Sequence, residues 1–547
     1  MTYLFAFLLS MALCMIIIPM MIKLAPKLGM IDIPEERKVH VKPIPRVGGV
    51  GIVLGAMFPA ALLLPFEEVY MAYIIGCLVL LVFGVLDDVK ELGHYTKFIG
   101  QFIAAIILVY YGNLYVYHFP FMGLEYLPER IGKPFTVFAL MGMMNATNHS
   151  DGLDGLAGGL SLVSFIAIAY LIYQTGDNQA IVIVLAAMGG IFGFLRFNTH
   201  PAIVFMGDGG SQFLGFTLGV VAVLLTQNIN PALSAALPLL LLGLPVVDIL
   251  AVFAQRIYHK MNWFKASKNH IHHRLLELGF YHQESVIIIY IIQIFLVSCG
   301  VLLVYESDYL ITALYLLVCI SLFMFLLLSE RKGWRAHKTQ NSEGVLARFI
   351  EIVTRNRAFS TVPYQILNLA IPFVFILSSI SAQNISYDIS ITATLLSLLL
   401  IVSLLIKNKQ LANGIYKVVV YVTAAFAIFF ENKYLADFFG SPENLDVLYF
   451  GVIAFCVGLV IKYNSKNDFR TTPMDYLMVV AIIVSAIILN LEESMHEYAI
   501  LVVKLLIVFY ASEIILNKSR KLISEIGVSV IITHSILIYK GVSAIFG

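Results

Sequence analysis

The chain has 547 residues, of which 60% are hydrophobic and only 13% are charged, and its formal net charge is +1. Its mean hydropathy of +0.89 is typical of polytopic membrane proteins and excludes a large water-soluble core. The net charge alone says nothing about a nucleic-acid partner, and none is expected for a membrane protein whose charges are informative mainly through their position along the chain. The five cysteines stand singly in apolar stretches, without the spacing of a metal or redox motif, and are interpreted as packing residues.

Apolar runs long enough to cross a bilayer as helices, roughly 18 residues or more, recur along the whole chain. The first, residues 1–21, lacks a basic start and a small-residue cleavage site, so we expect a retained span. The pattern predicts an all-α polytopic membrane protein, with about 11 spans in a domain of residues 1–330. Residues 331–361 are predicted to form a basic cytoplasmic linker, and residues 362–547 a second membrane domain of about seven helices.

Most of the 35 Lys and Arg residues fall in the loops on one side of these predicted spans. Because cytoplasmic loops carry an excess of Lys and Arg, that side is predicted to be cytoplasmic and the N-terminus external. Five polar stretches fall on this same side. They are "EERKVHVKPIPRVGG" (35–49), "LDDVKELGHYTK" (86–97), "NATNHSDGLDG" (145–155), "FNTHPAIVFMGDGGS" (197–211) and "NHIHHR" (269–274).

Carboxylates in these stretches are too costly to face lipid, because an Asp at the centre of a membrane helix costs about 2.5–3.5 kcal/mol. We therefore expect them at helix ends that face water, a metal or a ligand. Any one stretch could be an ordinary loop, but the outer loops contain nothing comparable to the set. The aspartates among these carboxylates are Asp87, Asp88, Asp151, Asp154 and Asp208.

Two of these stretches suit metal and phosphate chemistry. Adjacent Asp87 and Asp88 need a nearby cation, such as Lys97, to be ionised together, and such pairs serve as general bases or metal ligands. The glycines of "MGDGGS" free backbone N–H groups at the predicted start of a span, where phosphate binds well. Asp208 within this stretch could hold the metal that bridges such a phosphate, although a plain turn is the alternative.

A third stretch has oxygen-bearing side chains at regular spacing. Asn145, Asn148, Asp151 and Asp154 recur every three residues, which on a helix would form one polar stripe. Oxygen ligands of this kind suit Mg²⁺.

The last of the five stretches contains "HIHHR" (270–274), which offers three histidines and an arginine. A zinc site is one interpretation, but no cysteine and no second histidine pair lies near. Anion or sugar contacts are therefore favoured, with zinc and a solvated loop as the alternatives.

Together these stretches resemble signatures of the polyprenyl-phosphate N-acetylhexosamine-1-phosphate transferases, the membrane family of the MraY, WecA and TagO enzymes. The resemblance covers about residues 1–330 and implies attack of undecaprenyl phosphate, or a similar lipid, on a UDP-N-acetylhexosamine. It further implies Mg²⁺, with Mn²⁺ as an alternative, release of UMP, and a multi-pass enzyme of the inner (cytoplasmic) membrane that starts cell-envelope polysaccharide synthesis with its active site on the cytoplasmic face. The signatures are "LDDVKELGHYTK", "NATNHSDGLDGLAGG", "FMGDGGSQFLGF", "HIHHRL" and, more loosely, "RKVHVKPIPRVGG".

The resemblance also implies roles for single residues. Asp208 resembles the principal metal ligand, and Asn148 a second one. Asp87, with Asp88 beside it, resembles the residue that deprotonates or positions the lipid phosphate, and Lys97 resembles a phosphate-binding lysine.

For the nucleotide, Phe205 resembles the ring that stacks on uracil and Asp154 a uracil contact, with Asp151 and Asn145 placed in the same site. The segment from Arg256 to the histidines is similar to that of the WecA and TagO branch, although Ser267 stands where an Asp is expected. GlcNAc is therefore the first expectation for the sugar, and another UDP-N-acetylhexosamine stays open. The residues expected to contact sugar or phosphate are Arg256, His270, His272, His273 and Lys38.

Two other classes of function remain open. A secondary transporter would also have many spans and intramembrane charge, but its site should lie near the bilayer midplane. An inactive family member is the other alternative, against which the intact acidic residues argue. Residues 362–547 resemble nothing, and their role in holding partners, forming a homodimer or handling the lipid product stays open. Lys504 and Glu513 in this region are interpreted either as functional or as paired structural charges.

Overall fold

The computed structural model describes the chain in two units, Met1–Lys338 (unit 1) and Thr339–Gly547 (unit 2). The division falls within the segment 331–361 that separates the two predicted membrane domains. The described residues are all except 1, 35–41, 91–92, 122–125, 259, 261–268, 338–357, 384, 386, 407–408, 436–442, 464–495, 519–524 and 547.

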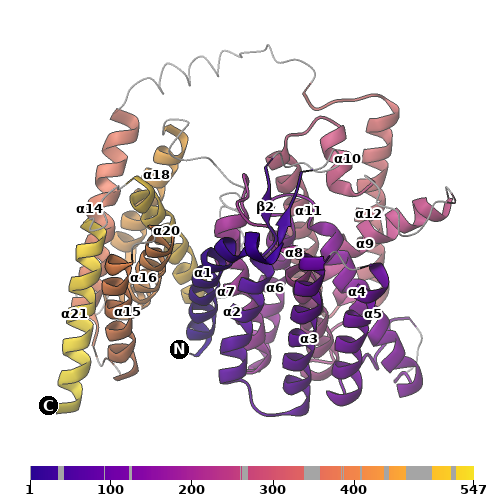
Figure 1. Ribbon diagram of the computed structural model, residues 1–547, viewed down its shortest axis with the longest axis horizontal. Coiled ribbons are helices and arrows are strands. Elements are labelled where there is room, and N and C mark those ends of the chain that lie inside the picture. The colour runs from indigo at the N-terminus through magenta and orange to yellow at the C-terminus, as the bar shows by residue number, and fades with distance from the viewer. Residues whose placement is uncertain are drawn as a thin grey trace. The chain divides into compact units, whose positions relative to one another are not determined.

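Unit 1 consists of helices and one short hairpin (Figure 1). The hairpin pairs β1 (Ile31–Asp32) antiparallel with β2 (Ile44–Pro45). π-helical turns, η1 (Ile107–Tyr111) and η2 (Leu224–Ile229), extend α4 and α8. The helices are α1 (Thr2–Leu28), α2 (Gly48–Leu63), α3 (Glu68–Lys90), α4 (His94–Ile106), α5 (Glu129–Ser150), α6 (Leu156–Thr175), α7 (Ala180–Asn198), α8 (Gly207–Val223), α9 (Leu237–Tyr258), α10 (Ile271–Glu277), α11 (His282–Leu302) and α12 (Asp308–Arg331).

Among the described residues, 11 helices are long and apolar enough to cross a membrane, and most of them lie in unit 1. The remaining predicted spans correspond to shorter apolar helices, to α5, to α20 (His496–Lys518) of unit 2, and to a run within 464–495 that lies outside the described residues. The prediction of an all-α polytopic membrane protein is thereby confirmed.

Helix α8 lies at the centre of unit 1, where it packs against α2, α3, α5, α6 and α7. Its residues from Gly209 to Ala222 are buried. Lipid gives no hydrophobic drive between helices, so close packing through small residues has to hold them together. Gly215 provides such a contact, because a Cβ there would lie 2.6 Å from the carbonyl oxygen of Met143 on α5.

Short polar turns reverse the chain between the long helices. Gly176 adopts a left-handed conformation (φ +76°) and ends α6. Asp177 then accepts hydrogen bonds from the backbone N–H groups of Gln179 and Ala180, at 2.9 and 2.8 Å, and so caps the start of α7. Helices α6 and α7 are thereby joined by a turn of only four residues, 176–179.

One end of unit 1 collects the polar stretches. Helices α3, α5 and α9 end there, and α8, α10 and α11 begin there, at the same end as the β1–β2 hairpin (Figure 1). The central helix α8 thus starts among the polar ends of its neighbours.

Unit 2 is also helical, and its buried charges are paired. Lys417 Nζ lies 3.2 Å from Glu513 Oε1, and Lys504 Nζ lies 3.0 Å from Glu431 Oε2. The structural interpretation of Lys504 and Glu513 as paired charges therefore agrees with these contacts. The elements are α14 (Ala358–Ser381), α15 (Tyr387–Leu405), α16 (Lys409–Phe430), η3 (Glu431–Leu435), α18 (Glu443–Tyr463), α20 (His496–Lys518) and α21 (Glu525–Phe546).

Candidate active site

Two close helix crossings place α8 against its neighbours at the polar end of unit 1. Gly84 of α3 lies against Gly209 of α8, and a Cβ on Gly84 would overlap the Cα of Gly209. Gly49 of α2 approaches Gly210 of α8 equally closely. Only glycine permits such an approach of two helix backbones. The crossings fix the start of α8 beside the end of α3.

At these crossings Asp87 and Asp88 of α3 meet Asp208 of α8, with Lys97 of α4 among them. The Lys97 Nζ lies 2.8 Å from Asp87 Oδ2 and 2.7 Å from Asp208 Oδ2. The backbone N–H of Asp208 donates to Asp88 Oδ1 at 3.3 Å. Gly207, with φ +71°, makes room for this carboxylate, because a Cβ there would lie 2.6 Å from Asp88 Oδ2. The Lys97 ammonium group thus pairs with two of the three carboxylates, and the third is held by the backbone of Asp208.

The donor atoms of this carboxylate cluster fit a divalent cation. One oxygen of each carboxylate lies within 4.8 Å of the others. Asp87 Oδ1 is buried and accepts no hydrogen bond within the described part of the chain. The three residues offer carboxylate oxygens, and oxygen donors are those that Mg²⁺ and Mn²⁺ prefer.

Asn148, the second predicted metal ligand, lies beside the cluster near the end of α5. Its Nδ2 donates to Ser211 Oγ at 3.0 Å, and its side chain also interacts with the Asp208 carboxylate. Asn145, one turn earlier, instead exchanges hydrogen bonds with Gln101 of α4, at 2.8 and 3.4 Å. The structure therefore brings Asn148 to Asp208 and ties Asn145 to α4.

The predicted helical stripe from Asn145 to Asp154 is wrong in its second half. Helix α5 ends at Ser150, and Asp151 already has a non-helical backbone. Gly155 is left-handed (φ +80°) and precedes α6. Because glycine favours this conformation, the chain turns here, and Asp151 and Asp154 lie on a loop rather than on the helix.

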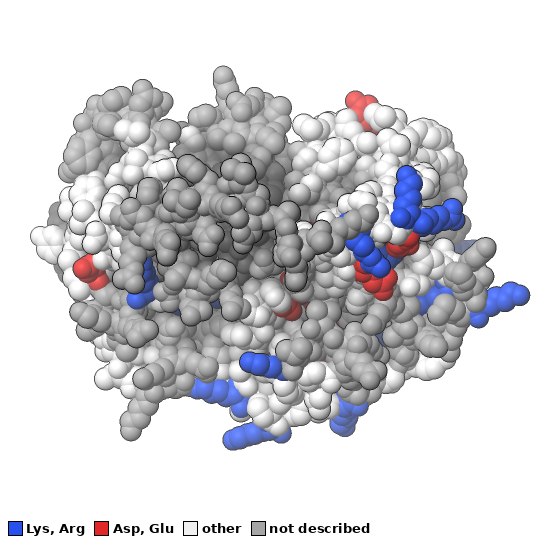
Figure 2. Space-filling view, turned by 90° about the horizontal axis from the view of Figure 1, so that it is seen from above, with Lys and Arg blue, Asp and Glu red and all other residues white. Residues whose placement is uncertain are grey.

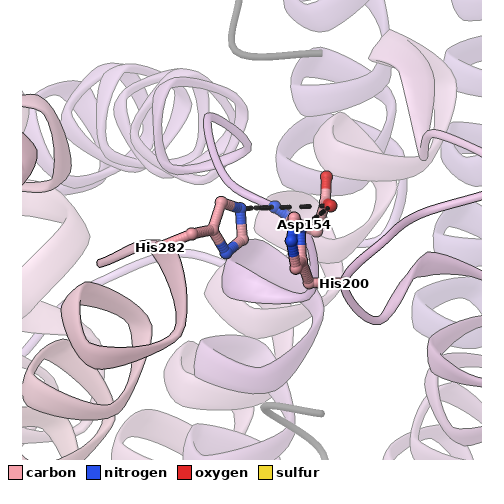
Figure 3. Close-up of side chains that lie close together, drawn as sticks. All are labelled: Asp154, His200 and His282. Atoms are coloured by element: carbon pink, nitrogen blue, oxygen red, sulfur yellow. Dashed lines mark hydrogen bonds and ion pairs between the residues drawn. The ribbon is translucent and has the colours of Figure 1, made fainter. Parts of the chain in front are cut away.

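Asp154 joins two histidines from distant segments (Figure 3). His200 Nδ1 lies 2.7 Å from Asp154 Oδ2, which also accepts the backbone N–H of Ala202 at 3.1 Å. His282, at the start of α11, stacks on His200 with ring centroids 4.2 Å apart, and its Nε2 accepts the backbone N–H of Asp154 at 3.2 Å. The three residues could hold a metal. Asp154 Oδ2, His200 Nδ1 and His282 Nε2 already hydrogen-bond to one another or to the backbone, whereas His282 Nδ1 is buried and has no hydrogen-bond partner among the described residues.

The two carboxylates of this loop differ in acidity. Burial, together with the charges of Asp208 and Asp154, raises the pKa of Asp151 to about 7. Burial also acts to raise the pKa of Asp154, but the hydrogen bonds from His200 and Ala202 outweigh it and lower that pKa below its usual range. At neutral pH Asp154 is therefore ionised, while Asp151 is close to its midpoint.

The histidine stretch forms a row of rings that reaches the other motifs. His270 stacks between His149 of α5 and His272, with ring centroids 5.2 and 5.7 Å away, and His273 follows 4.3 Å from His272. His149 interacts electrostatically with Asp208 and with Arg256, the predicted phosphate contact at the end of α9. This row links the histidines to the carboxylate cluster.

The hairpin closes the site next to Phe205. The Phe205 backbone accepts the N–H of Gly48 at 2.9 Å and donates to the carbonyl of Pro45 at 2.8 Å, and its side chain is half-buried. Arg46 pairs with Asp32 of the hairpin and interacts with Asp88. Lys38 lies outside the described residues, as does Ser267, which stands where the family pattern has an Asp.

Sequence reasoning missed Asp248, His200 and His282. Asp248 bonds to His270 from within α9, and its signal was a single Asp inside an apolar run. His200 stands within the quoted stretch 197–211, but nothing in the sequence pairs it with His282. Only packing of the chain brings these segments together.

Comparison with known proteins identifies relatives of this chain. Residues 70–226 match the model of glycosyl transferase family 4. A probable undecaprenyl-phosphate N-acetylglucosaminyl 1-phosphate transferase of Bacillus subtilis (strain 168) is 34% identical over 322 residues, which are 58% of this chain and 89% of that protein. The undecaprenyl-phosphate alpha-N-acetylglucosaminyl 1-phosphate transferase of Escherichia coli (strain K12) is 30% identical over 344 residues, 61% of this chain and 89% of that protein.

The counterpart in Haemophilus influenzae is 32% identical over 291 residues, 51% of this chain and 81% of that protein. These matches cover most of each relative and little more than half of the present chain, and the residues that match the family model lie within unit 1. The chain therefore belongs to glycosyl transferase family 4, the membrane family of the undecaprenyl-phosphate N-acetylglucosaminyl 1-phosphate transferases.

Proposed function

We propose that unit 1 transfers N-acetylglucosamine 1-phosphate from UDP-GlcNAc to undecaprenyl phosphate and releases UMP, with Mg²⁺ as its metal and the polar end facing the cytoplasm. The observation that carries this proposal is the cluster of Asp87, Asp88 and Asp208 around Lys97, with a buried carboxylate oxygen left open. The relatives act, by their names, on undecaprenyl phosphate and an N-acetylglucosaminyl 1-phosphate group.

In this reaction an oxygen of the lipid phosphate attacks the β-phosphorus of UDP-GlcNAc. A new phosphorus–oxygen bond forms, and the bond from the β-phosphorus to the bridging oxygen breaks, so that UMP leaves with the electron pair. Phosphoryl transfer of this kind depends mainly on positioning and charge neutralisation. Lys97 supplies a fixed positive charge between Asp87 and Asp208, and Asp87 is placed to accept the acceptor's proton or to orient it.

Asp208 and Asn148 would hold the divalent ion, which, when bound, neutralises the diphosphate. Both side chains meet at the start of α8, where Ser211 holds the Asn148 amide. Asp154 and Phe205 would bind the uracil, and the histidine row with Arg256 would contact sugar and phosphate. Asp154 is ionised at neutral pH, which suits a contact to a uracil N–H.

The charge distribution supports the orientation. Figure 2 looks onto the polar end and shows more Lys and Arg than Asp and Glu there. Positive residues favour the cytoplasmic side of a membrane, where nucleotide sugars are available in solution. A secondary transporter would need its polar site deep within the helices, whereas the carboxylates of unit 1 lie at the ends of α3 and α8.

The test is UMP release by the purified full-length protein with undecaprenyl phosphate and Mg²⁺, given UDP-GlcNAc, UDP-GalNAc or UDP-MurNAc-pentapeptide in parallel. We expect lipid-dependent release with UDP-GlcNAc. Asp208→Asn should lower kcat by about 10²–10³-fold. Asp177→Asn is the matched control. Asp177 caps the start of α7, and Asn caps a helix equally well.

UMP release with only one of the other two UDP-sugars would identify that sugar nucleotide as the donor in place of UDP-GlcNAc. No release from folded protein would reject the proposal.

Asp87→Asn separates the roles of the carboxylates. We expect it to lower kcat by about 10²–10⁴-fold and to leave the KM for UDP-GlcNAc unchanged. A raised KM with unchanged kcat would move Asp87 from the lipid phosphate to the nucleotide.

A further inference from the structure

Asp248, two turns before Arg256 on α9, is bound to the first histidine of the "HIHHR" stretch. Its Oδ2 lies 2.8 Å from His270 Nδ1, and its Oδ1 accepts the backbone N–H of Ile271 at 2.8 Å. Both side chains are buried, each about 8% exposed. One carboxylate thus holds both the ring of His270 and the first residue of α10.

These two hydrogen bonds occupy both oxygens of the Asp248 carboxylate. A buried carboxylate needs donors for its oxygens, and here each oxygen has one, from a ring and from a backbone. Because an ionised carboxylate only accepts, His270 donates from Nδ1. The ring is then fixed with its Nδ1–H toward α9, and no described residue bonds to its Nε2.

The orientation of His270 matters for the whole row of histidines. Its ring is nearly parallel to that of His272, with 6° between the planes, and is tilted by 20° from that of His149. His272 in turn contacts Gly152 so closely that a Cβ on this glycine would overlap Nε2 of the ring. A rotation of His270 would therefore disturb contacts on both sides.

We propose that Asp248 is a positioning residue for substrate recognition, which acts through His270. It sets the tautomer and orientation of His270, so that Nε2 is the ring nitrogen left for the sugar or phosphate of the donor substrate. This inference rests on the proposed function of the histidine row. The same carboxylate–histidine arrangement orients functional histidines in many enzymes.

Asp248→Asn is the informative variant, because it keeps the size of the side chain and removes one acceptor. If the Asn oxygen accepts from Ile271, its amide group faces His270 Nδ1 and forces the proton to Nε2. We expect kcat/KM for UDP-GlcNAc to fall about 10- to 100-fold. Asp248→Glu keeps the carboxylate and should recover part of the loss.

The decisive readout is a double-mutant comparison. If Asp248 acts through His270, Asp248→Asn lowers kcat/KM in the wild-type background but adds no further loss to His270→Gln. Equal losses in both backgrounds would overturn the proposal. Asp308→Asn is the control, because Asp308 also accepts from a side chain and a backbone N–H, at the opposite end of α9, and should leave kcat/KM unchanged.

A second readout does not depend on activity. In ¹⁵N spectra of histidine-labelled full-length protein, the His270 signal, identified by its loss in His270→Gln, should report Nδ1–H in the wild type. Asp248→Asn should convert it to Nε2–H, and an unchanged tautomer would overturn the inference. A wild type that releases no UMP would reject the proposed function, while these spectra still decide whether Asp248 sets the state of His270.

Discussion

Gly84 of α3 and Gly209 of α8 pack backbone against backbone. Gly209 directly follows Asp208, and Gly84 lies three residues before Asp87. The separation of the two helices at this point sets the separation of the carboxylates that they carry. Since Asp87 and Asp208 share Lys97, a small displacement of either helix changes both ion pairs. The crossing is thus part of the site, although neither glycine has chemistry of its own.

Gly84→Ala should therefore damage both stability and activity. The added methyl group has to push the helices apart, and overpacking of this kind costs about 1–3 kcal/mol. We expect a lower Tm and a reduced rate of UMP release. Gly142→Ala on α5 is the matched control, because a Cβ there meets no atom within 4 Å and alanine favours helix. Equal behaviour of the two variants would show that the crossing can relax without loss.

Gly152→Ala tests the contact between the "DGLDG" loop and the histidine row. The new Cβ would overlap Nε2 of His272 and displace that ring from its place. If His272 contacts the donor substrate, KM for UDP-GlcNAc should rise about tenfold while kcat changes little. Adding His272→Ala should remove the clash and restore Tm, but leave KM high. An unchanged KM in Gly152→Ala would exclude His272 from substrate binding.

The pH dependence of stability should reveal the two carboxylates of the same loop. The folded protein raises the pKa of Asp151 to about 7, so the stability it contributes in acid is lost as the pH rises from about 4 through 7. Asp151→Asn is neutral throughout, and its Tm should exceed that of the wild type increasingly over this range, measured without Mg²⁺. Asp154→Asn should show the opposite sign, because the pKa of Asp154 is lowered and its stabilisation is present at neutral pH. Parallel curves for Asp151→Asn and wild type would contradict the assignment.

The sequence predicted the composition of this site better than its geometry. Asp87, Asp88 and Asp208 could be placed at helix ends because charge in lipid is costly, and the structure puts them together. The prediction of a helical stripe through Asp154 was wrong, because the spacing of three residues does not show that the helix ends at Ser150 and that Gly155 is left-handed. Asp248 was missed although, like Lys504, it is an ionisable residue inside a predicted span. Such a residue is a functional hypothesis by default.

What the sequence could not supply was the pairing of distant segments. His200 and His282 meet at Asp154, and His149 meets His270, only because α5, α7, α9 and α11 end or begin at one end of unit 1. His149, His200 and His282 are unremarkable in their own stretches. Helix order along the chain fixes which ends are shared, but the packing around α8 decides which side chains touch.

Lys504 in unit 2 offers a test of the paired charges outside the residues that match the family model. It contacts the carboxylates of Glu431 and Asp446 from a buried position. Lys504→Met should leave both without their ammonium partner and lower the unfolding free energy of unit 2 by about 3–5 kcal/mol. Lys433→Met, two residues from Glu431 but exposed, is the control and should cost about 1 kcal/mol or less. Thermal unfolding measures both, and UMP release below the transition should stay at the wild-type rate, because the substituted residues lie outside unit 1. If Lys504→Met were as mild as the control, the pair would not be structural, and a functional role for this intramembrane lysine would become the better interpretation.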